Sequence, residues 1–187
     1  MKELRAFISI NINEMEIINE IVKIQNEFQR VEGRIKSIEQ ENIHITLKFL
    51  GNITEPMSKR IISKLNNVQF DPFELELKGL GCFPRPSRPR IIWVGCEKGT
   101  ENVRDIYNQI ESELSEFKFK KDRFRSHITI SRVKRINRSE IDRLKKILFS
   151  FKNKDFGTIK VNSFQLMKSV LTPKGPIYSV LENFKAS

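Results

Sequence analysis

Two short histidine motifs are the residues whose types and spacing could perform chemistry in this chain. His44 and His127 are the only histidines among 187 residues, and each begins a His-Ile-Thr run followed by an aliphatic residue. With six threonines in the chain, a threonine two positions after both histidines arises by chance about once in a thousand sequences of this composition. Because imidazoles change charge near neutral pH, the matched motifs predict one paired acid/base site.

Strand alternation gives these motifs a common geometry. If each motif lies on a strand, His44 and Thr46 share one face, and His127 and Thr129 share the equivalent face of a second strand. Placed side by side, the two strands would bring two imidazoles and two hydroxyls together over an apolar floor. Two histidines in opposite protonation states can serve as the base and the acid of an in-line displacement at phosphorus. The threonine hydroxyls would bind the non-bridging oxygens.

No metal and no cofactor are expected for such a reaction. Two histidines without a nearby aspartate or cysteine cluster make a poor zinc site, since three or four protein ligands are usual. Cys82 and Cys96 lack CxxC spacing and lie among apolar residues, so buried free thiols are expected. The alternative for the motifs is that both histidines are structural residues on half-buried strands. Two matching copies that hold every histidine of the chain disfavour that interpretation.

The residues around the motifs leave several roles open. Simple alternation places Arg132 on the face opposite His127, so Arg132 would reach a phosphate only if the strand bends or ends there. Lys48 has the parity of His44 but lies further along its strand. Phe49 and Trp93 are expected to be core aromatics rather than platforms for nucleobases. Tyr178 is likewise expected to pack within the fold.

Bulk composition restricts the partners. An excess of Lys and Arg gives a formal net charge of +11 and a pI near 9.8, which favours polyanionic partners such as nucleic acid, although the excess could also serve solubility alone. No run approaches the ~20 apolar residues that cross a membrane, and the first residues do not form a signal peptide. A cytoplasmic protein is expected.

The elements that must position the motifs alternate between strands and helices, in two halves that each contain one motif. Apolar spacing predicts one domain over 1–187 with two facing αβ lobes. Thr54 is expected to cap the second helix, and Asn137 with Glu140 to form a capping box before the fourth. The three prolines of segment 81–89 predict a cationic loop. Strands are expected at 4–12, 43–50, 73–80, 90–96, 126–133, 156–170 and 177–184, and helices at 14–30, 54–65, 103–117 and 137–149.

The two motifs and their flanks resemble a known family. Residues 42–51 (NIHITLKFLG) and 124–132 (FRSHITISR) are similar to the paired HxTx motifs of the two-histidine (2H) phosphoesterases. The similarity is closest to the RNA 2′,3′-cyclic phosphodiesterases, historically called 2′-5′ RNA ligases. It extends to residues 5–7, 81–95 and 169–178. Ser126 departs from the pattern, because many relatives have proline before the second histidine.

This resemblance implies an α+β, bilobal, pseudo-twofold-symmetric fold, with two mostly antiparallel sheets forming a central cleft and helices on the outside. It implies a metal-independent enzyme that opens a 2′,3′-cyclic phosphate at an RNA 3′ end, leaving a 2′-phosphomonoester. By match to the motifs, His44 would protonate the leaving O3′ and His127 would activate water. Thr46, Thr129 and Arg132 would bind the phosphate.

Two alternatives stay open at this point. The same site could cleave or form a 2′-5′ linkage, or the chain could bind RNA 3′-terminal phosphates without catalysis. The expected partners are RNA 3′ ends bearing a 2′,3′-cyclic phosphate, with tRNA fragments as one source, and the expected protein is a monomer without membrane contact. The residues alone would also fit the acid and base roles of His44 and His127 exchanged.

Overall fold

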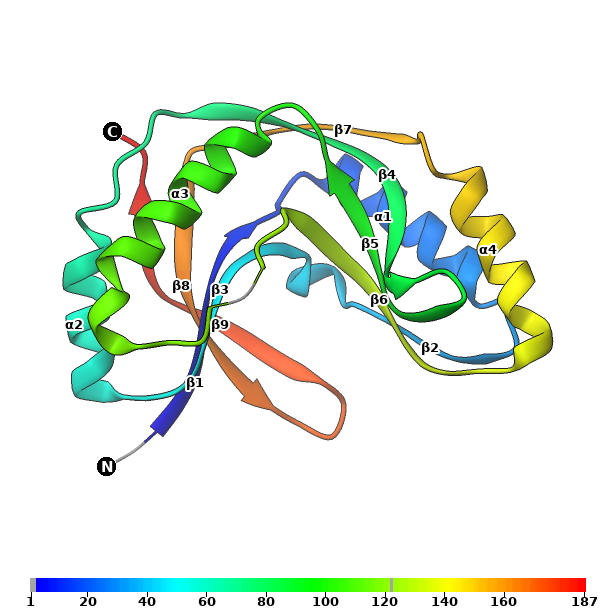
Figure 1. The fold of residues 1–187 in the computed structure, drawn as a ribbon, viewed down its shortest axis with the longest axis horizontal. Coiled ribbons are helices and arrows are strands. Elements are labelled where there is room, and N and C mark those ends of the chain that lie inside the picture. The colour runs from blue at the N-terminus through cyan, green and yellow to red at the C-terminus, as the bar shows by residue number, and fades with distance from the viewer. Residues whose placement is uncertain (1–2, 122) are drawn as a thin grey trace.

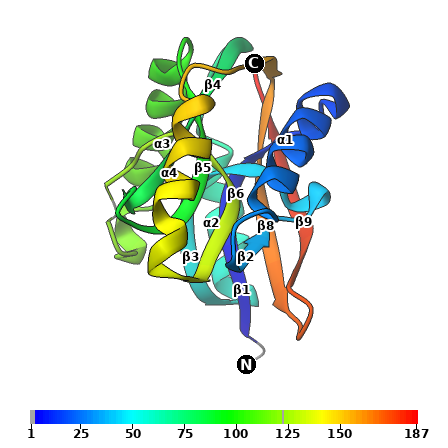
Figure 2. The same cartoon turned by 90° about the vertical axis from the view of Figure 1, so that its right-hand side faces the viewer.

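The computed structural model describes residues 3–121 and 123–187, which form a curled sheet with a helix pair at each end (Figures 1 and 2). The expected combination of helices with antiparallel strands is confirmed. The elements are β1 Glu3–Asn11, α1 Met15–Phe28, β2 Gly33–Ser37, β3 His44–Thr54, α2 Glu55–Leu65, β4 Phe73–Arg85, β5 Arg88–Cys96, α3 Thr100–Glu113, β6 His127–Ile136, α4 Ile141–Ser150, β7 Asp155–Val161, β8 Ser163–Leu171 and β9 Pro176–Lys185, with 3₁₀ turns at Gln40–Asn42, Ser115–Phe117 and Arg138–Glu140.

One hydrogen-bonded path joins the strands of both lobes. Their order is β7-β4-β5-β6-β3-β1-β8-β9, and β2 also pairs with β6. The two expected sheets therefore meet where β3 lies beside β6, at the antiparallel pair Ile45 and Ile128. Both isoleucines are fully buried. This junction places the two histidine motifs next to each other at the centre of the molecule.

Two of the helices, α1 and α3, lie in the other lobe from the strands that precede them. α1 follows β1 but contacts α4, β6 and β7, whereas α3 follows β5 but contacts α2 (Figure 1). The apolar face predicted for α1 is buried, and each fully buried Ile or Phe on it contributes roughly 1.5–3 kcal/mol of transfer free energy. The exchange makes each lobe depend on both halves of the sequence. The buried apolar residues of α1 are Ile17, Ile18, Ile21, Ile24 and Phe28.

The two helix-capping predictions have different outcomes. Thr54 caps α2 as expected, because its Oγ1 accepts a hydrogen bond from the Met57 amide at 3.4 Å. The capping box at Asn137 is wrong. A 3₁₀ turn precedes α4 there, the Asn137 side chain makes no capping bond, and the Glu140 carboxylate accepts instead from the Glu32 amide at 3.1 Å. The Glu140 carboxylate therefore binds a backbone amide far away in the sequence and not the Asn137 amide that a capping box would use.

The prediction of a loop at residues 81–89 is also wrong, because β4 and β5 extend into this segment and form a hairpin there. Arg85 pairs with Arg88 at the turn, and Pro84 pairs with Pro89. Since the two prolines oppose each other, their missing N–H donors fall at one rung of the ladder, beside a register shift. The hairpin therefore tolerates prolines that would interrupt a strand in the middle of a sheet.

The remaining bulk predictions concern thiols and membranes. Cys82 is buried and Cys96 partly buried, and both are free thiols. Burial raises the pKa of the Cys96 thiol to about 12, so it stays protonated at neutral pH. Within the described residues, no helix combines the length and apolar character needed to span a bilayer.

Candidate active site

The first nine residues of β3 and β6 share the same sequence of exposed and buried positions. In both strands the histidine and the threonine are partly exposed and the isoleucine between them is buried. Because Ile45 pairs with Ile128 in antiparallel register, His44 lies on the side of Thr129 and Thr46 on the side of His127. Diagonal neighbours in such a ladder have Cα atoms about 7–8 Å apart. The charge of His127 also acts on His44, so the two imidazoles lie near each other.

Both imidazoles are oriented by the same backbone contact. His44 Nδ1 lies 2.7 Å from the carbonyl oxygen of Asn42, and His127 Nδ1 lies 2.7 Å from that of Arg125. A carbonyl only accepts, so each Nδ1 carries a hydrogen and each Nε2 holds the lone pair or the exchangeable proton. His44 Nε2 lies 3.0 Å from Thr46 Oγ1. The site therefore has two imidazoles in the tautomer that acid/base catalysis through Nε2 requires.

Burial and positive charge favour the neutral imidazoles. Burial is the largest cause that lowers the pKa of His44, and the charges of Arg132 and His127 lower it further against the bond to Asn42. Burial likewise dominates the lowered pKa of His127, with Arg125 and Arg132 adding to it. A bound phosphodiester anion opposes these effects, because negative charge favours an imidazolium. Substrate binding would thus favour the protonated donor.

A β-bulge brings Arg132 to the face of the histidines. In β6, Thr129 pairs with Trp93 and Ser131 with Ile92, so Ile130 is an extra residue. The extra residue reverses the parity of the positions after it, which buries the Ser131 side chain and turns Arg132 outward. The strand distortion on which a phosphate contact by Arg132 depended is therefore present.

An equivalent bulge in β3 changes the expectation for Lys48 and Phe49. Ser9 pairs with Thr46 and Ile8 with Lys48, which leaves Leu47 as the extra residue. Lys48 is consequently buried and forms an ion pair with Glu111, so it stabilises the lobe rather than facing the histidines. Phe49 is 56% exposed, so the expectation of a core aromatic is wrong for it.

Aromatic rings enclose both imidazoles. The Phe7 ring lies 5.1 Å from that of His44, and the Tyr178 ring makes an edge contact with His44 at 5.6 Å between centroids. Phe7 lies on β1, which pairs with β3, and Tyr178 lies on β9, at the end of this half of the sheet. Sequence spacing gave no signal for either contact with His44. Apolar walls exclude water and explain the burial that lowers the pKa of His44.

A similar wall surrounds the second histidine. Phe83 of β4 contacts His127 edge-on at 5.2 Å, and Trp93 of β5 lies 6.3 Å from the same ring. The Arg125 guanidinium stacks over Trp93 at 4.6 Å. Trp93 is only 8% exposed, in line with its expected place in the core, and its Nε1 has no hydrogen-bond partner among the described residues. Arg125 was not singled out from the sequence, although it lies two positions before His127.

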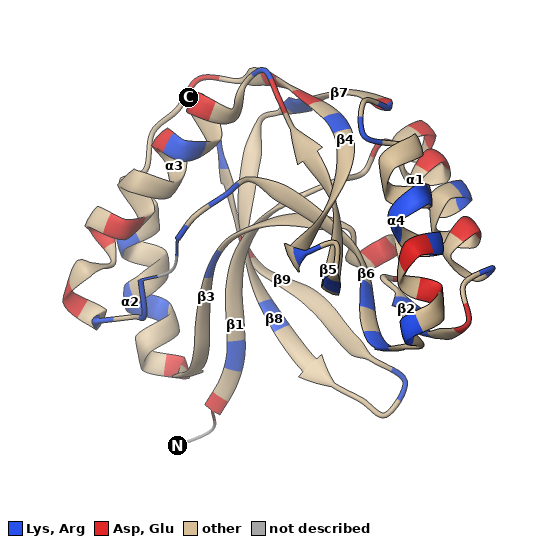
Figure 3. Cartoon of the chain, turned by 45° about the vertical axis from the view of Figure 1, so that its right-hand side comes forward, with Lys and Arg blue, Asp and Glu red and all other residues tan. Residues whose placement is uncertain are grey.

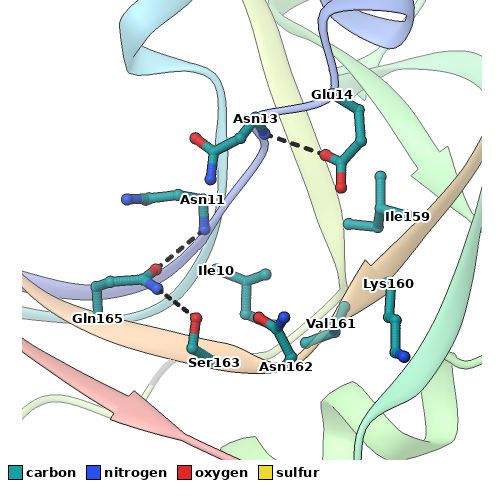
Figure 4. A pocket seen from close by; sticks show the side chains of 10 residues that line it. All are labelled: Ile10, Asn11, Asn13, Glu14, Ile159, Lys160, Val161, Asn162, Ser163 and Gln165. Carbon is teal, nitrogen blue, oxygen red and sulfur yellow. Dashed lines mark hydrogen bonds between the residues drawn. The ribbon is translucent and has the colours of Figure 1, made fainter.

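A small cavity of about 160 Å³ lies near one end of β1, and its lining includes neither motif (Figure 4). Gln165 accepts a hydrogen bond from the Asn11 amide at 3.2 Å and donates to Ser163 Oγ at 2.9 Å. The Asn13 amide donates to the Glu14 carboxylate at 3.1 Å. Because these polar groups are paired within the wall, we place the candidate site at the histidines and not in this cavity.

Comparisons with known proteins match nearly the whole chain. A family model described as the AKAP7 2′5′ RNA ligase-like domain matches residues 6–185. The RNA 2′,3′-cyclic phosphodiesterase of Archaeoglobus fulgidus is 38% identical over 97% of this chain and 100% of its own length. The relative of the same name from Methanocaldococcus jannaschii is 39% identical over the same shares of the two chains.

Solved structures agree with the fold. The Thermus thermophilus protein TT0787 superposes with a TM-score of 0.78 at 25% identity, over 97% of each chain. Escherichia coli LigT in its apo form has a TM-score of 0.76 over 100% of this chain and 99% of its own, and at 19% identity it supports the fold alone. With the family match over residues 6–185, these similarities show that the chain belongs to the 2′5′ RNA ligase-like family of 2H phosphoesterases.

Proposed function

We propose that this protein is an RNA 2′,3′-cyclic phosphodiesterase that opens a terminal 2′,3′-cyclic phosphate to a 2′-phosphomonoester. The observation that carries the proposal is the matched pair of imidazoles, each of which holds Nδ1 on a backbone carbonyl and so leaves Nε2 for proton transfer. The names of the relatives, which are RNA 2′,3′-cyclic phosphodiesterases, support the substrate class. A net charge of +11 is also suited to RNA.

In the proposed reaction, His127 Nε2 accepts a proton from water as the water oxygen attacks phosphorus. The P–O3′ bond breaks, and protonated His44 Nε2 gives its proton to O3′. Thr46 and Thr129 donate to the non-bridging oxygens, and Arg132 binds the same phosphate as charge develops on it. One water is consumed, and proton exchange with solvent returns both imidazoles to their starting states.

The test is hydrolysis of an RNA oligonucleotide that ends in a 2′,3′-cyclic phosphate, in the presence of EDTA. We expect a 2′-phosphate and a free 3′-hydroxyl. Turnover only after a divalent metal is added would contradict the metal-independent mechanism. No turnover of RNA whose 3′-terminal cyclic phosphate is intact would contradict the function. A 2′-5′-linked dinucleotide in a parallel assay tests the reaction of the alternative substrate.

We further propose that the protein acts as a cytoplasmic monomer on cyclic-phosphate ends such as those of tRNA fragments. Free thiols at Cys82 and Cys96 are compatible with a reducing compartment. Light scattering of the purified protein tests the monomer, and sequencing of cyclic-phosphate RNA ends in cells that lack the protein tests the substrates.

A further inference from the structure

The ribbon of β2 and β6 carries like charges in opposed positions. Arg34 pairs with Arg135, and Lys36 pairs with Arg132, across the antiparallel ladder. Like charges placed directly opposite each other destabilise a sheet, so folding does not account for these choices. All four side chains are exposed. We name this set the cationic ribbon.

No carboxylate neutralises the cationic ribbon among residues 3–121 and 123–187. None of its four members forms a salt bridge there, whereas cations elsewhere, such as Lys78 and Lys98, do. Lys36 donates instead to the Lys174 carbonyl at 2.7 Å, which ties the β8–β9 turn to β2. Figure 3 shows the Lys and Arg positions along β2 and the adjoining part of β6, with another at the tip of the β8–β9 hairpin. The ribbon is therefore a surface of unpaired positive charge.

The ribbon is continuous with the candidate active site. Arg132 is its first member, and the positive charge of Arg132 acts on both imidazoles. From Arg132 to Arg135 the strand extends about 10 Å, at ~3.3 Å per residue. A stacked nucleic-acid strand rises ~3.4 Å per nucleotide along its axis. The ribbon is thus about as long as three stacked nucleotides, and it leads directly away from the proposed position of the cyclic phosphate.

We propose that the cationic ribbon binds the phosphodiester backbone of the RNA strand upstream of the cyclic phosphate, so that oligonucleotide ends are preferred to cyclic mononucleotides. This inference rests on the proposed function and names its substrate class. RNA supplies a row of phosphates that matches the row of cations, while a cyclic mononucleotide has one phosphate and reaches Arg132 alone. Arg34 and Arg135, at the far end, then act only on the longer substrate.

The test uses the double variant Arg34→Gln and Arg135→Gln, which leaves Arg132 in place. Each lost phosphate contact with a single strand lowers the slope of log K against log salt by about 0.7, so two contacts account for about 25-fold in affinity at 0.1 M salt. We expect KM for a ten-nucleotide RNA with a cyclic-phosphate end to rise about 25-fold. KM for adenosine 2′,3′-cyclic phosphate should change less than twofold.

The matched control is Lys59→Gln with Arg104→Gln, which removes two exposed charges from α2 and α3. An equal rise of KM in this control would attribute the effect to net charge and overturn the inference, as would unchanged KM for the oligonucleotide in the ribbon variant. The melting temperature of the ribbon variant should be unchanged or higher, because it removes an opposed like-charge pair.

A binding assay separates this inference from the proposed function. Fluorescence anisotropy measures the affinity of each variant for a labelled ten-nucleotide RNA that already ends in a 2′-phosphate, and it requires no turnover. Loss of affinity and of salt dependence in the ribbon variant supports the ribbon even if the protein hydrolyses nothing. Equal affinity in all variants contradicts it even if hydrolysis is efficient.

Discussion

Replacing each histidine with asparagine separates the proposed acid from the proposed base. The asparagine amide can donate to the carbonyl that holds Nδ1, fills much of the same volume and does not titrate near neutral pH. His44 Nδ1 lies 2.7 Å from the Asn42 carbonyl oxygen. In His44→Asn the side-chain amide can donate to that carbonyl in its place, but no group replaces Nε2. The variants therefore remove proton transfer with little change in packing.

The expected loss depends on how firmly Nε2 is held. His44 is fixed at both ring nitrogens, by Asn42 and by Thr46 Oγ1, so its removal costs a well-positioned general acid. Such groups contribute about 10²–10⁴-fold, which corresponds to about 2.7–5.5 kcal/mol of the activation free energy. We expect about 10³-fold in kcat for the cyclic phosphate in either variant.

Two substrates distinguish the roles. An RNA cyclic phosphate has a poor alkoxide leaving group, whereas a p-nitrophenyl phosphodiester releases a phenolate that needs no proton. In His44→Asn, kcat should fall about 10³-fold for the cyclic phosphate and less than tenfold for the p-nitrophenyl diester. In His127→Asn, kcat should fall for both substrates, because water must still be activated. The opposite pattern would assign the general acid to His127 and the general base to His44. A loss below tenfold on the cyclic phosphate in both variants, with circular dichroism unchanged, would refute acid/base catalysis by this pair.

Single features of the structure lead to three further predictions. Because both imidazole pKa values are lowered, kcat/KM should peak below pH 7. Arg132→Gln removes a positive charge that lowers both pKa values, so it should move the peak to higher pH; an unmoved peak contradicts this. Thr46→Val and Thr129→Val should each lower kcat by about 10²-fold, with recovery in the serine variants. A Cβ at Gly81 would overlap the Trp93 ring, so Gly81→Ala should cost about 1–3 kcal/mol in urea unfolding, and a change below about 0.5 kcal/mol would contradict that packing.

Strand parity predicted the face of each motif correctly, but it failed for the later residues of the same strands. His44 with Thr46, and His127 with Thr129, needed only three residues of alternation, and the exposure patterns of β3 and β6 agree with it. The bulge at Ile130 arises from pairing with β5, more than thirty residues earlier in the chain. A sequence read strand by strand contains no signal for such a partner, so the parity of Arg132 was predicted incorrectly.

The elements that escaped prediction depend on partners in the same way. β2 is five residues long with a single apolar residue, Ile35, and it exists because β6 pairs with it about a hundred positions later. The hairpin across 81–89 depends on the alignment of Pro84 with Pro89. All four α-helices of the described residues were predicted, since an amphipathic face such as that of α1 is encoded within the helix itself.

The difference between the two halves gives the site a direction that matched histidines lack. Each bulge turns the fifth residue after its histidine outward, and this residue is Phe49 in one half and Arg132 in the other. Phe49 lies 6.3 Å from Phe7, which contacts His44, so apolar surface for a ribose and its base adjoins His44. Arg132 offers charge to the phosphate on the strand of His127. The repeated motif thus supplies two matched imidazoles, and the divergence at this one position makes their surroundings chemically different.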